Sequence, residues 1–133
     1  MSAARSLSLC FAAGAVGALA NSVVAWLFGQ LGIPHALGVS LAPAWTPAWL
    51  YPRIVWGGLW GLLFVLPLST NVLRRGLLLS LAPALFQLFV VFPAWTGKGV
   101  AGLELGAATP VFVLLYDAVW GVVASWWLKG TQG

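Results

Sequence analysis

The stretch TPVFVLLYDAVWGVVASWWLK, residues 109–129, decides the fold of this chain. As a helix it would be about 30 Å long, which is enough to cross the hydrocarbon core of a bilayer. It nevertheless carries Asp117 near its middle, one of only two acidic residues in the protein. A carboxylate at that depth is costly unless it is protonated, paired or hydrated. The neighbours of Asp117 are therefore expected to accommodate it.

The composition of the whole chain agrees with a membrane setting. Of its 133 residues, 62% are hydrophobic and only 6% are charged, and the mean hydropathy is +1.01. Soluble domains carry about 25% charged residues. The six Lys and Arg residues stand near the ends of hydrophobic runs, which is typical of membrane topology signals and lipid headgroup contact. We expect a lipid bilayer as partner and no nucleic acid.

Four hydrophobic segments with short connections predict an all-α fold. We expect a polytopic, antiparallel four-transmembrane-helix bundle, forming one domain over residues 1–133. The expected spans are 9–32, 53–69, 76–95 and 109–128. Residues 33–52, IPHALGVSLAPAWTPAWLYP, are too rich in proline for a regular span, so we expect a Pro/Trp-rich interfacial segment between spans one and two.

Small and aromatic residues indicate helix contacts and membrane depth. Glycine and alanine at helical spacing let two helix backbones approach closely. The predicted packing residues are Gly14, Ala18, Gly57, Gly61 and Gly121. Aromatic rings at the ends of hydrophobic runs are expected to anchor the chain at the membrane interface. The predicted anchors are Trp45, Trp49, Tyr51, Trp95, Trp126 and Trp127.

Three predicted spans each place one strongly polar side chain near mid-membrane: Asn21, Gln87 and Asp117. Arg53 is a possible counter-ion if its side chain reaches down from the outer end of span two. In a structural reading, the amides of Asn21 and Gln87 donate to Asp117 and fix the helix register. In a functional reading, Asp117 takes up and releases a proton, or binds a cation, on a path through the bundle. The sequence leaves both readings open.

Spans two to four carry a resemblance to a known group of proteins. The run RGLLLSLAPALFQLFVVFPAW (75–95), a glycine-rich loop and the later YDAVWG (116–121) resemble small bacterial inner-membrane proteins of the YagU type. The clearest matches are Gly76-Leu77-Leu78, Gln87-Leu88-Phe89-Val90 and Phe92-Pro93. The resemblance covers about half the chain and implies a four-helix architecture in the bacterial inner (cytoplasmic) membrane. It implies nothing about mechanism.

Basic residues predict the orientation in that membrane. Arg5, Arg74, Arg75 and Lys129 would lie inside, against Arg53 and Lys98 outside. Because cytoplasmic loops carry an excess of Lys and Arg, both termini are expected in the cytoplasm.

The residues favour a non-catalytic protein. The chain has no paired carboxylates, no Cys/His cluster and a single histidine, so neither an enzyme, a cofactor nor a metal site is expected. The preferred hypothesis is an accessory subunit or homo-oligomer that packs in the inner membrane through its glycine faces and tryptophans. The alternative is a small proton-coupled or cation transporter or channel that uses Asp117 with Asn21 and Gln87.

Overall fold

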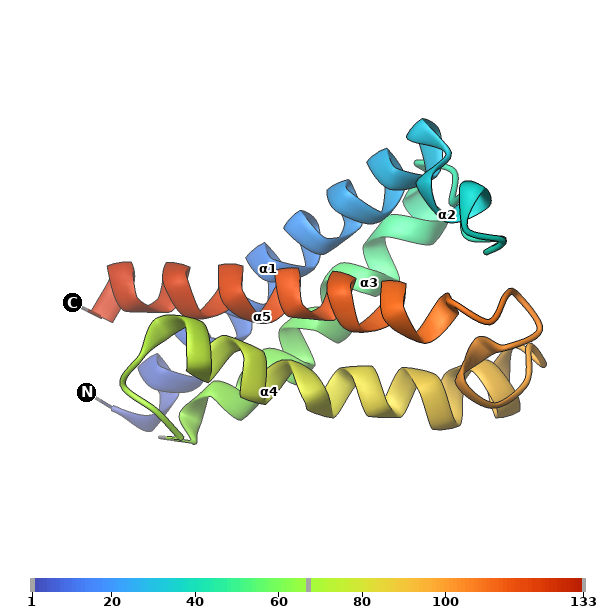
Figure 1. The fold of residues 1–133 in the computed structure, drawn as a ribbon. Coiled ribbons are helices and arrows are strands. Elements are labelled where there is room, and N and C mark those ends of the chain that lie inside the picture. The colour runs from blue at the N-terminus through green and yellow to red at the C-terminus, as the bar shows by residue number, and fades with distance from the viewer. Residues whose placement is uncertain (1, 67, 133) are drawn as a thin grey trace.

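The computed structural model describes residues 2–66 and 68–132, and the elements in these ranges are all helical (Figure 1). The long elements are α1 (Ala3–Leu31), α3 (Pro47–Gly61), α4 (Val72–Phe86) and α5 (Thr109–Gln132). Helix α3 continues as the 3₁₀-helix η1 (Leu62–Val65), and α4 continues as the π-helix η2 (Gln87–Trp95). Two short elements, α2 (Ile33–Ala36) and the 3₁₀-helix η3 (Val100–Gly102), lie in the connections.

Local signals in the sequence set the starts of these helices. The side chains of Ser2, Thr46 and Asn71 each accept a hydrogen bond from a backbone N–H in the first turn of α1, α3 and α4. Pro47 begins α3, a position where its missing N–H costs nothing. Gly32 ends α1 with a left-handed backbone, φ 74°, which glycine adopts without steric cost.

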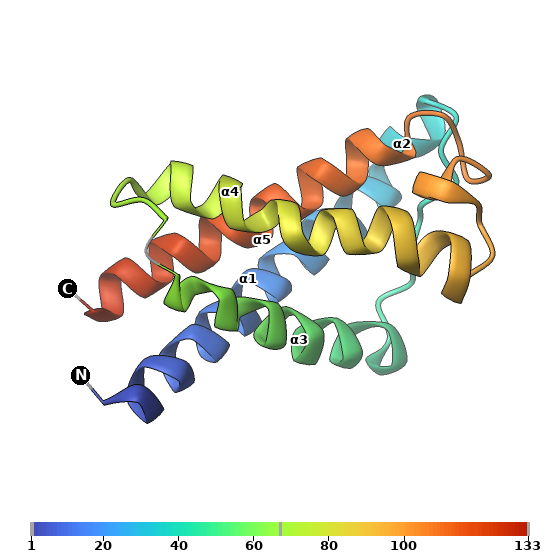
Figure 2. The same ribbon diagram turned by 90° about the horizontal axis from the view of Figure 1, so that it is seen from below.

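Helix α1 packs against both α3 and α5, and α5 packs in turn against α4. Figures 1 and 2 show α4 and α5 running side by side, with α1 crossing α5 at an angle. The N- and C-terminal ends of the described chain lie at the same end of the molecule, whereas α2 and the loop after η2 lie at the other. Helix α3 therefore packs mainly against α1, and α4 packs mainly against α5, while α3 and α4 make few backbone contacts with each other.

Glycine allows the closest helix contacts. A Cβ added at Gly14 would lie 2.7 Å from the Cα of Gly61 and would clash with the carbonyl oxygen of Gly57. Gly76 and Gly121 meet backbone to backbone in the same way between α4 and α5. The predicted packing residues thus lie inside the chain, in its own helix interfaces.

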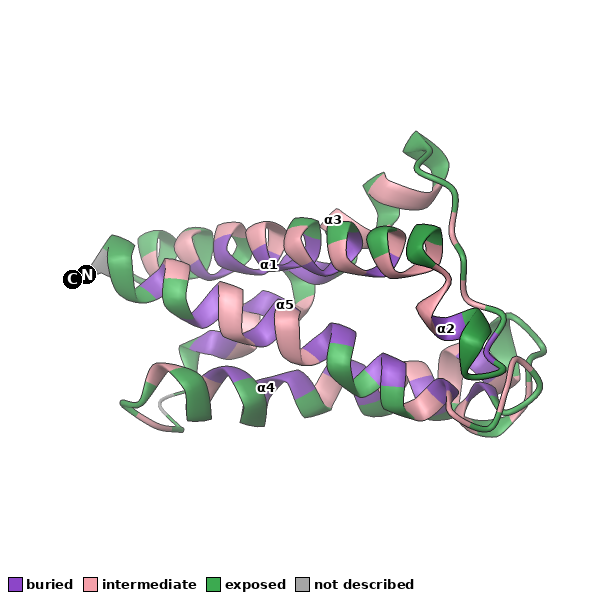
Figure 3. Cartoon of the chain, turned by 45° about the horizontal axis from the view of Figure 1, so that its top comes forward, coloured by how far each residue is buried: buried purple, intermediate pink, exposed green. Residues whose placement is uncertain are grey.

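The surface is rich in large apolar side chains, many of them on the outward faces of the helices. Figure 3 shows buried residues on the faces that the helices turn towards one another. Among the described residues, the helices Ala3–Leu31, Val72–Trp95 and Thr109–Thr131 are long and apolar enough to cross a membrane. The all-helical prediction is confirmed, and so is the presence of membrane-capable helices. A bundle of four spans is not established, because α3 has only 15 residues.

Several predicted boundaries differ from the structure: α1 begins at Ala3 rather than at residue 9, and the second helical stretch covers residues 47–65 rather than 53–69. The proline-rich segment 33–52 is partly helical, because α3 already begins at Pro47 and carries Pro52 within it. Pro52 removes one backbone hydrogen bond, the one that an N–H at this position would donate to the carbonyl of Ala48, and the helix continues past it. The span predicted at 76–95 begins earlier, at Val72, and changes from α to π geometry at Gln87.

We predict that Gly14→Ala destabilises the protein, because the new methyl group meets the backbone of α3. Overpacking of this kind costs about 1–3 kcal/mol. Thermal unfolding of the purified protein in detergent would show a lower midpoint. Gly130→Ala is the matched control, since no atom lies within 4 Å of the added Cβ, and it should leave the midpoint unchanged or slightly raised. Equal midpoints for both variants would contradict the close α1–α3 contact.

Candidate functional site

A cavity of about 310 Å³ lies where α3 and α4 face each other across α1 and α5. Each of four helical segments contributes one strongly polar side chain to it: Asn21 from α1, Arg53 from α3, Gln87 from η2 and Asp117 from α5. The sequence singled out these same four residues. The structure brings them together in one cavity.

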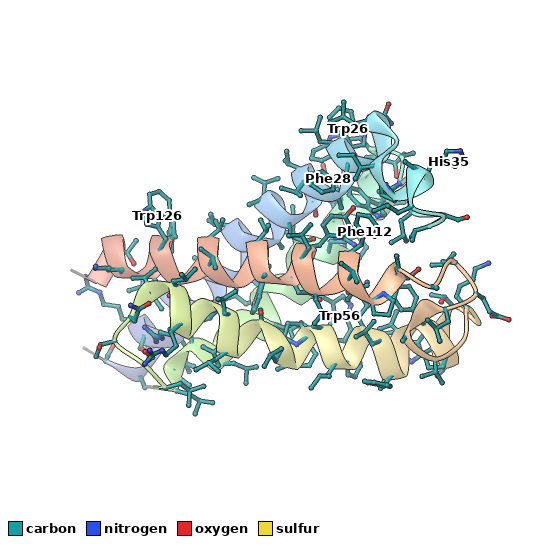
Figure 4. All side chains as sticks on the ribbon, in the orientation of Figure 1. Trp26, Phe28, His35, Trp56, Phe112 and Trp126 are labelled. Atoms are coloured by element: carbon teal, nitrogen blue, oxygen red, sulfur yellow. The ribbon has the colours of Figure 1, made fainter. Side chains whose placement is uncertain are left out.

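Aromatic rings form much of the cavity wall. Trp56 and Trp60 of α3, Phe86 and Trp95 of the α4–η2 helix, and Trp120 of α5 line it. Ring centroids are 6.1 Å apart for Trp56 and Trp95, 5.3 Å for Phe86 and Trp95, and 5.4 Å for Trp60 and Phe86. These contacts link α3 to the α4–η2 helix. Trp56 and Trp95 remain about half exposed, at 48% and 58%, so this wall also faces the surroundings of the protein (Figure 4 labels Trp56).

Arg53 is held in place by hydrogen bonds to α1. Its Nε donates to Ser22 Oγ at 3.0 Å, and its Nη2 donates to the amide oxygen of Asn21. The guanidinium also stacks on Trp49, 4.6 Å from the ring centroid. Asn21 in turn donates its amide nitrogen to the backbone carbonyl of Tyr116 at 2.6 Å. A continuous polar chain therefore joins α3, α1 and α5 beside Asp117.

Asp117 is buried, at 9% exposure, and its Oδ2 has no hydrogen-bond partner among the described residues. The predicted donations from Asn21 and Gln87 to Asp117 are not among the hydrogen bonds of the described residues, and the amide nitrogen of Asn21 donates to Tyr116 instead. Arg53 reaches the cavity from α3, yet its hydrogen bonds go to α1 rather than to the carboxylate. Asp117 is left as an unpartnered acid at the cavity surface.

A second cavity, of about 400 Å³, adjoins the first and shares Asn21, Arg53 and Gln87 with it. It extends to Ser40, Thr96 and Lys98, in the two connections at the end of the molecule away from the termini. Asp117 lines only the first of the two cavities. The shared polar residues lie where they meet.

The predicted interfacial residues fall into two groups. Trp45, Tyr51, Trp95 and Trp126 are exposed, and Figure 4 shows Trp126 projecting from α5 away from the other helices. Trp49 and Trp127 are half-buried: Trp49 contacts Arg53, and Trp127 packs against the core around Cys10 and Leu128. Trp95 is both exposed and part of the cavity wall.

Sequence reasoning missed Ser22 as a partner of Arg53 and the tryptophans as cavity walls. Helical spacing carries a signal for both. Arg53, Trp56 and Trp60 recur at intervals of three and four residues, which places them on one face of α3. Pro83, Gln87, Val91 and Trp95 recur every four residues and all line the cavity. The spacing of residues along one helix does not show which face of another helix it packs against.

Among the residues that the structure describes, no group of three or more His, Cys, Asp or Glu side chains converges as a metal site would need. His35 is exposed near the tip of the α2 region (Figure 4). Comparisons with protein-family models, with curated proteins and with solved structures find no match for the chain. The resemblance to proteins of the YagU type therefore stays a prediction.

We predict that Asn21→Ala lowers the unfolding midpoint, because it removes an acceptor from the half-buried Arg53 guanidinium. Hydrogen bonds to charged groups contribute about 1.5–3 kcal/mol. Gln30→Ala, an exposed amide on the same helix, is the control and should behave like the unchanged protein. A midpoint for Asn21→Ala equal to that of the control would contradict the Arg53–Asn21 bond. The measurement is circular dichroism during heating in one detergent.

Proposed function

We propose that this chain is a small transport protein of the bacterial inner membrane, with Asp117 as the group that takes up and releases a proton or binds a cation. The observation that supports it most is the convergence of Asn21, Arg53, Gln87 and Asp117 on one cavity between the helices. Ionisable groups inside a membrane bundle commonly mark substrate or ion pathways. The transport role needs no catalytic group and no cofactor.

A four-span topology is part of the proposal. Helix α3 and η1 together cover residues 47–65, and their rises give a length of about 30 Å. That equals the thickness of a typical hydrocarbon core. With α3–η1 counted as a span, the chain crosses four times and its termini lie on one side, in line with their common end in Figure 1. The basic residues Arg5, Arg74, Arg75 and Lys129 favour the cytoplasm for that side.

The second candidate is an accessory subunit or homo-oligomer. Its main argument was a free glycine surface, but Gly14, Gly57, Gly61 and Gly121 are buried in contacts between helices of this chain. The remaining support for this candidate is the half-exposed aromatic wall of Trp56 and Trp95 between α3 and the α4–η2 helix, where a helix of a partner could bind. For this reason the transport role is preferred here.

Cysteine labelling tests whether the cavity is open to water. The background variant is Cys10→Ala, since Cys10 is the single cysteine. In that background, Gln87→Cys should react with a charged, membrane-impermeant thiol reagent in native vesicles, because water reaches the cavity. Leu85→Cys is the matched control: it lies on the same helix, is 51% exposed on the outside of the bundle and should face lipid. Thiols react as thiolates, which need water.

Each labelling pattern has a definite meaning. Reaction at Gln87→Cys alone supports a water-accessible cavity in the membrane. No reaction at either position means a sealed cavity and favours the accessory-subunit role. Reaction at both positions contradicts the proposal that the α4–η2 helix is embedded in lipid.

Proton flux tests the role of Asp117 directly. We expect liposomes with the purified protein to take up protons under a potassium diffusion potential faster than protein-free liposomes, as read by an internal pH-sensitive dye. Asp117→Asn should reduce uptake to the protein-free rate, because the amide does not titrate. Glu104→Gln, which changes the only other acid at an exposed loop position, should retain it. Equal rates for the unchanged protein and Asp117→Asn would contradict a proton-carrying role for Asp117.

A further inference from the structure

We infer that the cavity between α3 and the α4–η2 helix binds a small zwitterion, with its ammonium group at Asp117 and its carboxylate or phosphate group at Arg53. This inference rests on the proposed function and names the chemical class of its solute. Four features of the cavity support it: two unpaired opposite charges, an oriented guanidinium, aromatic walls and a small volume.

Asp117 and Arg53 line one cavity without pairing. In the described ranges, 2–66 and 68–132, no hydrogen bond or ion pair joins the two side chains, and Asp117 Oδ2 has no partner at all. A buried charge without its counter-ion costs free energy. A ligand that carries both signs can satisfy the two groups at once. A ligand with a single charge would satisfy one and be repelled by the other.

Arg53 is oriented for an anion before any ligand binds. Ser22 and Asn21 accept from its Nε and Nη2, and Trp49 supports the face of the guanidinium. These contacts leave other guanidinium N–H groups available for the planar, two-point binding that carboxylate and phosphate groups favour. Because Arg53 is already held in place, little side-chain entropy is lost on binding.

The side of the cavity around Asp117 suits an ammonium group. Asp117 lines the cavity and makes no hydrogen bond to a described residue at its buried Oδ2, and Trp56, Trp60 and Trp120 line the same space. Tryptophan faces attract organic cations through the ring quadrupole, most strongly where water is excluded. An acid among tryptophans is the combination that an alkylammonium group needs.

The volume limits the size of the ligand. About 310 Å³ lies at the small end of known ligand sites, which span about 300–1,000 Å³. A free amino acid fits this description, and so does the ethanolamine phosphate headgroup of a lipid that enters between α3 and the α4–η2 helix. Both sources present an ammonium and an anion joined by a short linker.

The test is isothermal titration of the full-length protein in nanodiscs made of phosphatidylglycerol alone. The probes are glycine, β-alanine and γ-aminobutyrate, which are zwitterions of increasing charge separation, with n-butylamine and butyrate as single-charge controls. We expect the best zwitterion to bind at least about tenfold more tightly than either control, because two charged contacts replace one. Asp117→Asn and Arg53→Gln should each weaken it about tenfold or more.

Matched variants separate charge from folding. Glu104→Gln and Arg74→Gln remove one acid and one base at exposed positions, and both should bind like the unchanged protein. Asp117→Glu keeps the charge and should bind more tightly than Asp117→Asn. Each variant is compared by size-exclusion chromatography and circular dichroism, so that a misfolded variant is not counted as a loss of binding.

Added phosphatidylethanolamine distinguishes the two sources. If it competes with the best zwitterion, the site takes the lipid headgroup, and if it does not, the site takes a free solute. The inference is overturned if n-butylamine binds as tightly as the zwitterions, or if Arg53→Gln leaves binding unchanged. It is also overturned if neither the zwitterions nor phosphatidylethanolamine bind. In these cases a labelled Gln87→Cys would still support the transport function, whereas an unlabelled one would remove both proposals.

Discussion

The close approach of α1 to α3 is the constraint on which the rest of the structure depends. Gly14 meets Gly57 and Gly61 at backbone distance, so α3 lies flat against α1. The carbonyl of Gly14 also accepts a hydrogen bond from Trp120 Nε1 at 3.0 Å, which ties α5 to the same point. Gly14 thus fixes α1, α3 and α5 against one another. Because α3 lies this close to α1, the side chain of Arg53 reaches its acceptors on α1. Larger side chains there would move the guanidinium away from its acceptors.

The polar side chains of the cavity have only some of their hydrogen bonds formed, and Asn21 and Asp117 differ in this respect. Asn21 uses both ends of its amide, once with Tyr116 and once with Arg53. Asp117 is equally buried but has an oxygen without a partner. A network selected for stability alone would gain by satisfying the buried carboxylate, since each unsatisfied group costs about 1–3 kcal/mol. The unpartnered oxygen is the observation from which the proposed role of Asp117 starts.

The sequence predicted much of this fold, for reasons that can be located. The hydrophobic runs marked α1, α4–η2 and α5, because length and apolar composition determine whether a helix can cross a membrane. The four polar residues were visible because charged and amide side chains are rare in such runs. Their similar depth in the membrane also predicted a polar cluster, but not the hydrogen bonds within it, since spacing gives the face of one helix and not its partner. The start of α3 at Pro47 was hidden by proline density, although Thr46-Pro47 is a normal helix start.

The position of Trp95 in the cavity wall limits which insertions and deletions the π-helix η2 tolerates. Each π turn holds more residues than an α turn. Gln87, Val91 and Trp95, which recur every four residues in this segment, all line the cavity. Deleting a single residue there would rotate every downstream side chain around the helix axis by one residue's share of a turn. Gln87 would remain while Trp95 turned out of the wall. The spacing of this segment is therefore less tolerant of insertions and deletions than an ordinary lipid-facing helix.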